Sequence, residues 1–268
     1  MQNRYLYFPS SEPPSAKSLA VEKMTLWQKT SADYRGLIAD REAPAPNGTF
    51  VLFHGNGGTA LNRGFYIEPL GKLGFRVILA EYPKYGGRPG KVGEKPFVAD
   101  GLETVRLAYE QYGGSLYLLG ESLGCGVAAA VARHTSVPIA GLILMTPWDT
   151  LAAVAKSLFP FLPLSLLLTD QYDNIGNLRS FVGKISVISA ERDEILPLHH
   201  AQHLFQSLPE GKKWMWAIPG AGHNDWPFYA EASLWKEMTD FVKPTSEPGQ
   251  GLAGHSGLKG LPLTSIPG

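Results

Sequence analysis

The stretch Ser115-Leu-Tyr-Leu-Leu-Gly-Glu-Ser-Leu-Gly-Cys-Gly-Val-Ala-Ala-Ala130 joins an apolar run to a segment of small residues. The apolar run predicts a buried strand, and the small-residue segment predicts a helix. Between them lies Gly120-Glu-Ser-Leu-Gly124, a turn with a glycine on each side of its centre. These glycines permit a turn sharp enough to hold a strained residue at its apex. The strand–turn–helix pattern therefore indicates Ser122 as an exposed nucleophile.

Short runs of Val, Ile, Leu and Phe recur on both sides of this stretch. From residue 49 onward they lie at 49–53, 76–80, 115–119, 139–145, 184–189 and 213–218. Most are separated by segments long enough for a helix, at 95–112, 122–134, 198–208 and 225–242. Such alternation predicts an α/β fold with a doubly wound, mostly parallel sheet of about eight strands and helices on both faces. Earlier runs at 4–8, 23–29 and 34–39 lack long helices between them and predict an antiparallel start.

Two segments depart from this alternation. Residues 147–180 form an insertion between two predicted strands, and long insertions at the carboxyl edge of a sheet are commonly lids. An ordinary helix packed on the sheet is the alternative interpretation. Residues 244–268 carry Gly or Pro at ten of 25 positions, which predicts a flexible tail. We therefore expect one domain over residues 1–243.

Composition excludes several classes of function. The 268 residues include 24 Lys+Arg and 24 Asp+Glu, and a balanced charge argues against a nucleic-acid partner. Cys125 is the single cysteine, so an internal disulfide and a cysteine-based zinc cluster are excluded, and we expect Cys125 to pack inside its helix. The chain starts without an apolar signal region, and its longest apolar stretch, 158–168, is too short to span a bilayer. We expect a cytoplasmic protein with no transmembrane segment.

A serine hydroxyl needs a base to take its proton, and position selects His223 among the seven histidines. His223 lies in Pro219-Gly-Ala-Gly-His-Asn-Asp225, directly after the run at 213–218. The expected chain order is nucleophile, acid, histidine, each in a loop after a strand. His199, His200 and His203 lie on one predicted helix. His199 and His203 are spaced i,i+4 and could hold a metal, but no pattern of acidic ligands accompanies them. A solvated helix face is expected there, and no metal site.

The acid of this arrangement is expected after the run at 184–189. The following segment, Ala190-Glu-Arg-Asp-Glu-Ile-Leu-Pro197, contains Asp193, whose carboxylate would orient the imidazole. Its neighbours Glu191 and Glu194 are expected to be solvated. Asp149 and Asp173, in the insertion, remain alternatives for the acid.

An oxyanion hole is expected from two loops. The run at 49–53 ends in His54-Gly-Asn-Gly-Gly58, and such a loop supplies one N–H donor while the residue after the nucleophile supplies the other. These donors are Asn56 and Leu123, with Gly57 the next candidate and a neighbour of the substrate. His54 is expected to be a structural hydrogen-bonding residue beneath the loop.

Taken together, the motifs at 54–58, 120–124, 192–197 and 220–224 resemble those of the α/β-hydrolase superfamily. More narrowly, they resemble its small serine hydrolases with an HGN-type oxyanion loop, a group that includes bacterial esterases and protein depalmitoylases. The segment Glu81-Tyr-Pro-Lys-Tyr-Gly-Gly-Arg-Pro-Gly90 is similar to a Tyr-Arg-Gly-Tyr-Gly loop of that group, from which Pro83 and Lys84 depart. The resemblance implies acyl transfer to water through an acyl-enzyme, without a metal or organic cofactor.

We therefore expect hydrolysis of a small-molecule carboxylic ester with a small to medium acyl or aryl group. Aromatic side chains of the insertion and of the histidine loop would line an apolar substrate site: Trp148, Phe159, Phe161 and Trp226. A thioesterase or depalmitoylase with the same three residues is the near alternative. A non-catalytic binding protein on the same fold is the third.

Overall fold

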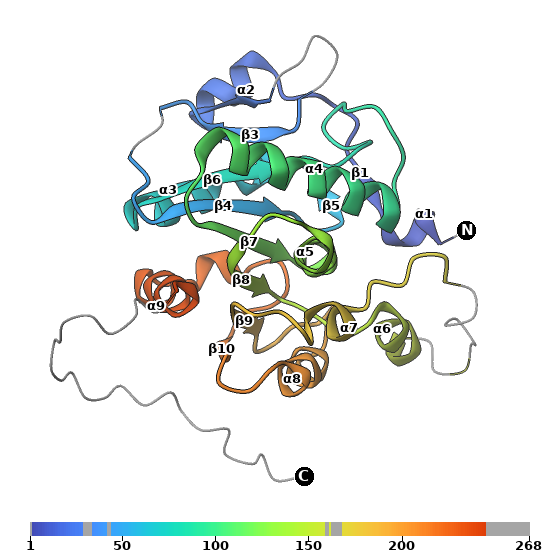
Figure 1. Cartoon of the computed structure of the whole chain (residues 1–268). Helices are drawn as coiled ribbons and strands as arrows, with labels where there is room; N and C mark the ends of the chain where they lie inside the picture. The colour runs from blue at the N-terminus through green and yellow to red at the C-terminus, as the bar shows by residue number, and fades with distance from the viewer. Residues whose placement is uncertain (1, 29–33, 42–43, 159–160, 162–167, 245–268) are drawn as a thin grey trace, which may run out of the picture.

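The computed structural model describes residues 2–28, 34–41, 44–158, 161 and 168–244. The strands of its central sheet are β2 (Met24–Trp27), β3 (Gly36–Ala39), β4 (Gly48–Phe53), β6 (Phe75–Ala80), β7 (Leu116–Glu121), β8 (Ile139–Met145), β9 (Lys184–Ala190) and β10 (Lys213–Ile218). Their order is β10-β9-β8-β7-β4-β6-β3-β2 (Figure 1). Neighbours from β10 to β6 run parallel, whereas β3 is antiparallel to β6 and β2 to β3. The predicted α/β fold is confirmed: eight strands, mostly parallel, with an antiparallel start.

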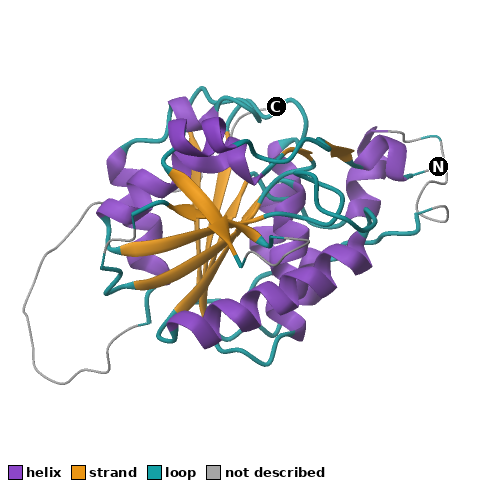
Figure 2. Ribbon diagram, turned by 90° about the horizontal axis from the view of Figure 1, so that it is seen from above, coloured by secondary structure: helices purple, strands orange, loops and turns teal. Residues whose placement is uncertain are grey.

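Helices cover both faces of this sheet (Figure 2). The main ones are α3 (Ile67–Lys72), α4 (Glu94–Tyr112), α5 (Leu123–His134), α6 (Leu151–Leu158), α7 (Asn174–Leu178), α8 (Leu198–Ser207) and α9 (Ala232–Val242). Alternate residues of β4 enter two separate cores, because side chains of a strand point to opposite faces. Val51 and Phe53 pack with residues of α4, α5 and α8, whereas Phe50 and Leu52 pack with residues of α3 and α9. The sheet is buried on both sides, as its continuous apolar runs predicted.

The amino-terminal segment differs from the prediction. Residues 4–8 were expected to be a strand of the antiparallel start, but the chain forms a short helix α1 (Asn3–Leu6) followed by β1 (Phe8–Pro9). Strand β1 pairs in parallel with β5 (Gly57–Gly58), away from the central sheet. The side chain of Tyr7 fixes this position, since its buried hydroxyl donates to Asp170 Oδ2 over 2.7 Å and lies 3.2 Å from Tyr172 Oη.

The insertion contains α6 and α7, and its two ends are held together. The Leu151 N–H donates to Tyr172 O over 3.2 Å, and the Asn174 N–H donates to Asp149 O over 3.0 Å. Helix α7 packs against α5. Within the described ranges, no helix is long and apolar enough to cross a bilayer. The predicted tail, apart from its first residue, lies outside the described residues, as does most of 159–167.

Candidate active site

Ser122 lies at the turn between β7 and α5, at the carboxyl edge of the sheet. Its backbone has φ 51° and ψ −116°, a conformation that a non-glycine residue adopts only under strain. The flanking glycines are needed for close packing. A Cβ on Gly120 would lie 2.6 Å from Cys125 Cα, and one on Gly124 would lie 1.9 Å from Phe53 O. The strand, the turn and the helix therefore press together and leave Ser122 at the apex, as a nucleophile elbow requires.

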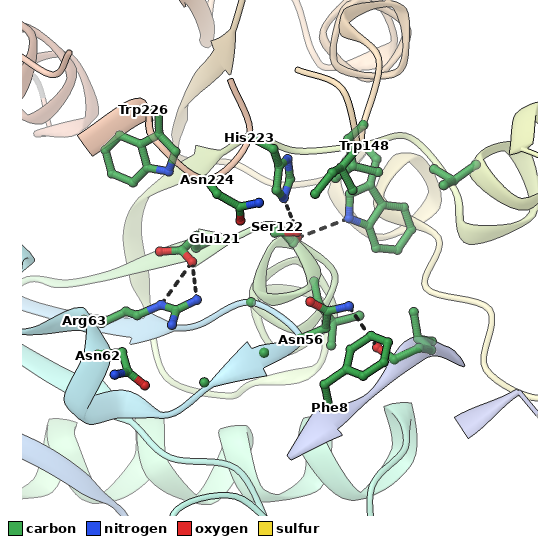
Figure 3. Close-up of a pocket in the computed structure, with 18 of the residues that line it drawn as sticks. Phe8, Asn56, Asn62, Arg63, Glu121, Ser122, Trp148, His223, Asn224 and Trp226 are labelled. Carbon is green, nitrogen blue, oxygen red and sulfur yellow. Dashed lines mark hydrogen bonds and ion pairs between the residues drawn. The ribbon is translucent and has the colours of Figure 1, made fainter. Parts of the chain in front are cut away.

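The structure brings Ser122, His223 and Asp193 into one hydrogen-bonded line. His223 Nε2 lies 3.0 Å from Ser122 Oγ (Figure 3), and His223 Nδ1 lies 2.7 Å from Asp193 Oδ2. Both distances are within the reach required of a nucleophile, its base and the group that orients the base. The side chains of His223 and Asp193 are buried, with 7% and 4% of their surface exposed. Shielding from water strengthens the electrostatic interaction between them.

The loops that carry Asp193 and His223 are bound to each other. The other carboxylate oxygen of Asp193 accepts hydrogen bonds from the N–H groups of Ile195 (3.0 Å) and Leu196 (2.6 Å). The neighbouring Glu194 accepts from the His223 N–H over 3.2 Å, and Glu191 accepts from the Gly220 N–H over 2.7 Å. Glu191 and Glu194 were expected to be solvated neighbours. They are exposed, but both fix the backbone of the histidine loop.

The loop of Asn56 is held by three hydrogen bonds. Asn56 O accepts from the Phe8 N–H (3.0 Å) and from the Tyr85 hydroxyl (2.6 Å), and Asn56 Nδ2 donates to Leu6 O (3.1 Å). Leu123 is the first residue of α5, where helix geometry leaves the N–H without an intrahelical acceptor. Both residues line the cavity above Ser122. Sequence reasoning missed Leu6, Phe8 and Tyr85, since their contacts to residue 56 are not local in the chain.

His54 lies beneath this loop, as a structural residue. Its Nδ1 lies 2.7 Å from Gly55 O, and its Nε2 lies 2.9 Å from Glu81 Oε1. Both side chains of this pair are buried, and the second oxygen of Glu81 accepts from the Ala60 N–H over 3.0 Å. The hydroxyl of Tyr82 donates to His54 O over 2.8 Å. The segment that leads into the oxyanion loop is therefore fixed from below.

A cavity of about 740 Å³ opens above Ser122. Trp148, Trp226 and Gly57 line it as expected, and the Trp148 indole N–H donates to Ser122 O over 3.2 Å. Phe161 is not among the residues that line it, and 96% of its surface is exposed. Phe159 lies outside the described residues. The apolar wall is instead built by residues that sequence reasoning missed: Tyr5, Leu6, Phe8, Leu151, Val154, Leu158, Ile195 and Leu196.

Comparison with known proteins gives the family. Residues 48–165 match the family model of the alpha/beta hydrolase fold. An uncharacterized protein of Mycobacterium tuberculosis (strain ATCC 25618 / H37Rv) is 32% identical over 259 residues, which cover 93% of this chain and 90% of that protein. The chain belongs to the α/β-hydrolase family.

One more distant relative of this α/β-hydrolase and one solved structure of the same fold have an activity in their names. The lysophosphatidylserine lipase ABHD12 of Mus musculus is 26% identical over 201 residues, which cover 68% of this chain and 50% of that protein. The solved structure of the Pyrococcus furiosus esterase Pf2001 superposes with a TM-score of 0.64 at 17% identity, and covers 88% of this chain and 98% of that chain. The structural likeness shows a shared fold. The narrower resemblance to hydrolases with an HGN-type loop stays a prediction.

One side of the cavity of the hydrolase is polar. Glu121, next to the nucleophile, accepts from Arg63 Nε (3.0 Å) and Nη2 (2.6 Å) on one oxygen and from the Tyr66 hydroxyl (2.9 Å) on the other. Burial raises the pKa of Tyr66 well above its usual value, and the adjacent Glu121 raises it further. Burial opposes the charge of Arg63, but Glu121 outweighs burial and raises the Arg63 pKa. Arg63 therefore keeps its positive charge beside Glu121.

Two of the three histidines of α8, His200 and His203, belong to a separate cluster around Asp149. His200 Nδ1 lies 2.9 Å and His203 Nδ1 lies 2.8 Å from the two oxygens of Asp149. His200 Nε2 lies 3.0 Å from Ser157 Oγ on α6. His200 is buried, contrary to the expected solvated helix face, whereas His199 is exposed. The part of the chain that the structure describes contains no group of three or more residues able to hold a metal.

The alternatives for the acid are engaged elsewhere. Asp149 binds the two α8 histidines, and Asp173 caps α7 by accepting from the Gly176 N–H over 2.8 Å. Cys125 is fully buried in α5, where its thiol faces Gly120 O and Met145 O at 3.2 and 3.3 Å. Burial raises the pKa of this thiol well above its usual value. Cys125 therefore packs the helix onto the sheet and is a poor nucleophile.

Proposed function

We propose that this hydrolase cleaves carboxylic esters with small to medium acyl or aryl groups, through an acyl-enzyme formed on Ser122. The observation that carries the proposal is the line Ser122 Oγ–His223 Nε2–Asp193, with distances of 3.0 and 2.7 Å. Nucleophile, base and orienting acid lie within hydrogen-bond reach of one another, and Ser122 and His223 line a cavity.

In the first half-reaction, Ser122 Oγ attacks the ester carbonyl while His223 Nε2 takes the hydroxyl proton. Asp193 holds the Nδ1–H tautomer of His223 and stabilises the imidazolium that forms. The negative carbonyl oxygen of the tetrahedral intermediate accepts from the N–H groups of Asn56 and Leu123. The intermediate then collapses, and His223 gives its proton to the leaving alcohol. Water enters, loses a proton to His223 and releases the acid from Ser122 by the same steps.

The size and lining of the cavity support a substrate of limited size. A volume of about 740 Å³ lies within the range of sites that enclose small molecules. Apolar residues of α1 and α6, with Ile195, Leu196 and Trp148, line the cavity. An acyl chain packed against these residues would be removed from water, and burial of each CH₂ group contributes roughly 0.8 kcal/mol.

A fluorophosphonate probe and p-nitrophenyl esters test the proposal. We expect the probe to label the wild type at Ser122, and we expect Ser122→Ala to lose both labelling and ester turnover. Ser157→Ala is a matched control, because Ser157 Oγ also lies 3.0 Å from a histidine Nε2 but sits inside α6. That variant should keep labelling and turnover. Turnover that survives in Ser122→Ala, or a wild type inert to every ester and to the probe, would contradict the proposal.

The same three residues would serve a thioesterase. Oxygen and thiol esters of one acyl chain separate the two activities, because only the leaving group differs between them. We expect comparable kcat/KM values after correction for the reactivity of the leaving group. A thiol ester hydrolysed a hundredfold faster would assign the enzyme to the thioesterases instead.

A further inference from the structure

The cavity has two chemically different sides, and Ser122 lies between them. Figure 3 shows Trp148 and Phe8 on one side of Ser122, and Arg63, Asn224 and Trp226 on the other. The first side is apolar. The second side, which we call the polar side, contains Asn62, Arg63, Glu121 and Asn224, together with the rings of Trp226 and Phe65, whose centroids lie 5.8 Å apart. An ester held at Ser122 places its acyl group on one side and its alcohol on the other.

The polar side carries hydrogen-bond donors that the protein itself leaves unused. Arg63 directs Nε and Nη2 to Glu121, and its Nη1 has no hydrogen-bond partner among the described residues. Asn62 Oδ1 accepts from the Thr59 N–H over 2.9 Å, which leaves Asn62 Nδ2 as a donor without a partner in the described part of the chain. The amide of Asn224 is exposed and forms no hydrogen bond to the described residues.

The backbone leaves room for a ligand beside these donors. A Cβ on Gly58 would lie 2.8 Å from Arg63 Nη1, so the missing side chain allows the guanidinium to lie against the loop. A Cβ on Gly57 would meet no atom within 4 Å. Both glycines line the cavity. The cavity is therefore open at Gly57, the residue before the glycine against which Arg63 Nη1 lies.

The charges on this side cancel. Among the described residues that line the cavity, Arg63 and Glu121 are the only ones of the types Lys, Arg, Asp and Glu. They are paired at 2.6 Å. An anionic group placed against Arg63 would therefore also meet the Glu121 carboxylate, whereas a hydroxyl group would accept from Nη1 without a cost in charge. A site that has unpaired hydrogen-bond donors but no net charge favours neutral hydroxyl oxygens as its ligands.

We propose that the polar side binds the alcohol part of the substrate, and that this alcohol is a neutral polyol such as glycerol. The inference rests on the proposed esterase function and names its substrate class: an acyl ester of a polyol, with the chain on the apolar side and free hydroxyls against Arg63, Asn62 and Asn224. When the intermediate collapses, the His223 proton passes to the ester oxygen of the polyol, which leaves along the polar side. Arg63 and Asn224 then determine specificity without taking part in the bond-breaking step.

Three octanoate esters test this inference: methyl octanoate, 1-octanoylglycerol and 1-octanoylglycerol 3-phosphate. For the wild type we expect kcat/KM to be highest for the glycerol ester, at least tenfold above the methyl ester and above the phosphorylated ester. Asn224→Leu and Arg63→Lys should each lower the ratio of glycerol ester to methyl ester by roughly three- to tenfold, the effect of one lost hydrogen bond. Asn177→Leu is the matched control, since Asn177 lies on α7 outside the cavity, and its ratio should equal that of the wild type.

The outcomes separate the two proposals. Equal kcat/KM for methyl and glycerol esters, or an unchanged ratio in both variants, overturns the polyol site but leaves the esterase function intact. A preference for the phosphorylated ester also overturns it, in favour of an anionic head group. Hydrolysis of none of the three esters contradicts the esterase function itself. Asn224→Leu removes no hydrogen bond to the described residues and keeps the test valid if Arg63→Lys does not fold.

Discussion

The carboxylate of Glu194 accepts a hydrogen bond from the backbone N–H of His223 over 3.2 Å. Its neighbour Asp193 holds the imidazole of the same histidine. Two consecutive acidic residues therefore bind His223, one at the main chain and one at the ring. A Cβ on Gly222 would lie 2.8 Å from Glu194 Oε2, so the glycine before His223 allows this approach. Glu194 is a positioning residue in this arrangement.

Replacement of Glu194 tests this positioning role. We expect Glu194→Ala to lower kcat for a p-nitrophenyl ester about fivefold to tenfold, because about 1 kcal/mol of hydrogen bonding to the histidine loop is lost. Glu194→Gln keeps an acceptor oxygen and should restore most of kcat. Equal losses in both variants would show that the charge matters and not the hydrogen bond.

Asp193→Asn is expected to reduce kcat by about four orders of magnitude, the size of the effect of the corresponding change in a serine protease. An asparagine still accepts from the N–H groups of Ile195 and Leu196, so the melting temperature should change little. Asp225→Asn is the matched control, because Asp225 accepts from the Gly222 N–H in the same loop. A control variant as inactive as Asp193→Asn would point to loss of the loop conformation as the cause.

The tether between Asn56 and Leu6 should matter for catalysis more than for stability. Asn56→Ala loses the 3.1 Å hydrogen bond to Leu6 O, and we expect kcat to fall about fivefold as the oxyanion donor loosens. Asn47→Ala removes a similar bond, 2.7 Å long, to Leu73 O. Both variants should lower the melting temperature by similar amounts, but Asn47→Ala should leave kcat unchanged. Equal losses of kcat in the two variants would show that the hydrogen bond of Asn56 to Leu6 O has no special role in holding the oxyanion loop.

Val154 offers a test of the apolar side. It is a buried residue of α6 that lines the cavity, and Val154→Phe adds volume where the acyl chain is proposed to lie. We expect kcat/KM for p-nitrophenyl octanoate to fall at least tenfold relative to p-nitrophenyl acetate. Ala153→Phe adds a larger group on the same helix at a position that does not line the cavity, and should leave the ratio unchanged. An unchanged ratio in Val154→Phe would place the acyl chain elsewhere.

The Asp149 cluster predicts a pH dependence of stability. Burial raises the Asp149 pKa, but the hydrogen bonds from His203, the Thr150 N–H and His200 outweigh burial and lower it. A carboxyl whose folded pKa is lowered stabilises the protein above its unfolded pKa, about 3.9, and loses this contribution as the pH falls through the folded value. Asp149→Asn should therefore melt well below the wild type at pH 7, and the gap in melting temperature should become smaller as the pH is lowered below about 3.9. A gap that keeps its size as the pH falls would contradict this linkage.

The parts of the hydrolase that follow from local sequence were predictable. Continuous apolar runs predicted β4 and β6 to β10, and chain order placed Ser122, Asp193 and His223 in loops that meet at one edge of the sheet. The wall of the cavity was not predictable in the same way. Phe161 is aromatic and lies in the insertion, yet it is exposed to solvent. Val154 lines the cavity because it lies on the face of α6 that is turned toward the cavity. Glu194 also has no local signal, since its partner lies 29 residues further along the chain.

The residues proposed for catalysis and most of the residues proposed to bind the acyl group lie on different segments of the chain. The two-residue pairing of β1 with β5 holds one of the acyl-binding segments, the amino-terminal one, at the cavity. The proposed triad of Ser122, Asp193 and His223 lies on loops that follow strands of the central sheet, whereas α1 with β1 and α6 contribute most of the apolar residues that line the cavity. Substitutions accumulated in α1 and α6 during divergence would reshape the acyl site without moving Ser122 or His223. Members of this family with the same triad therefore need not share a substrate, and the amino-terminal segment is where we would look first for a change in acyl preference.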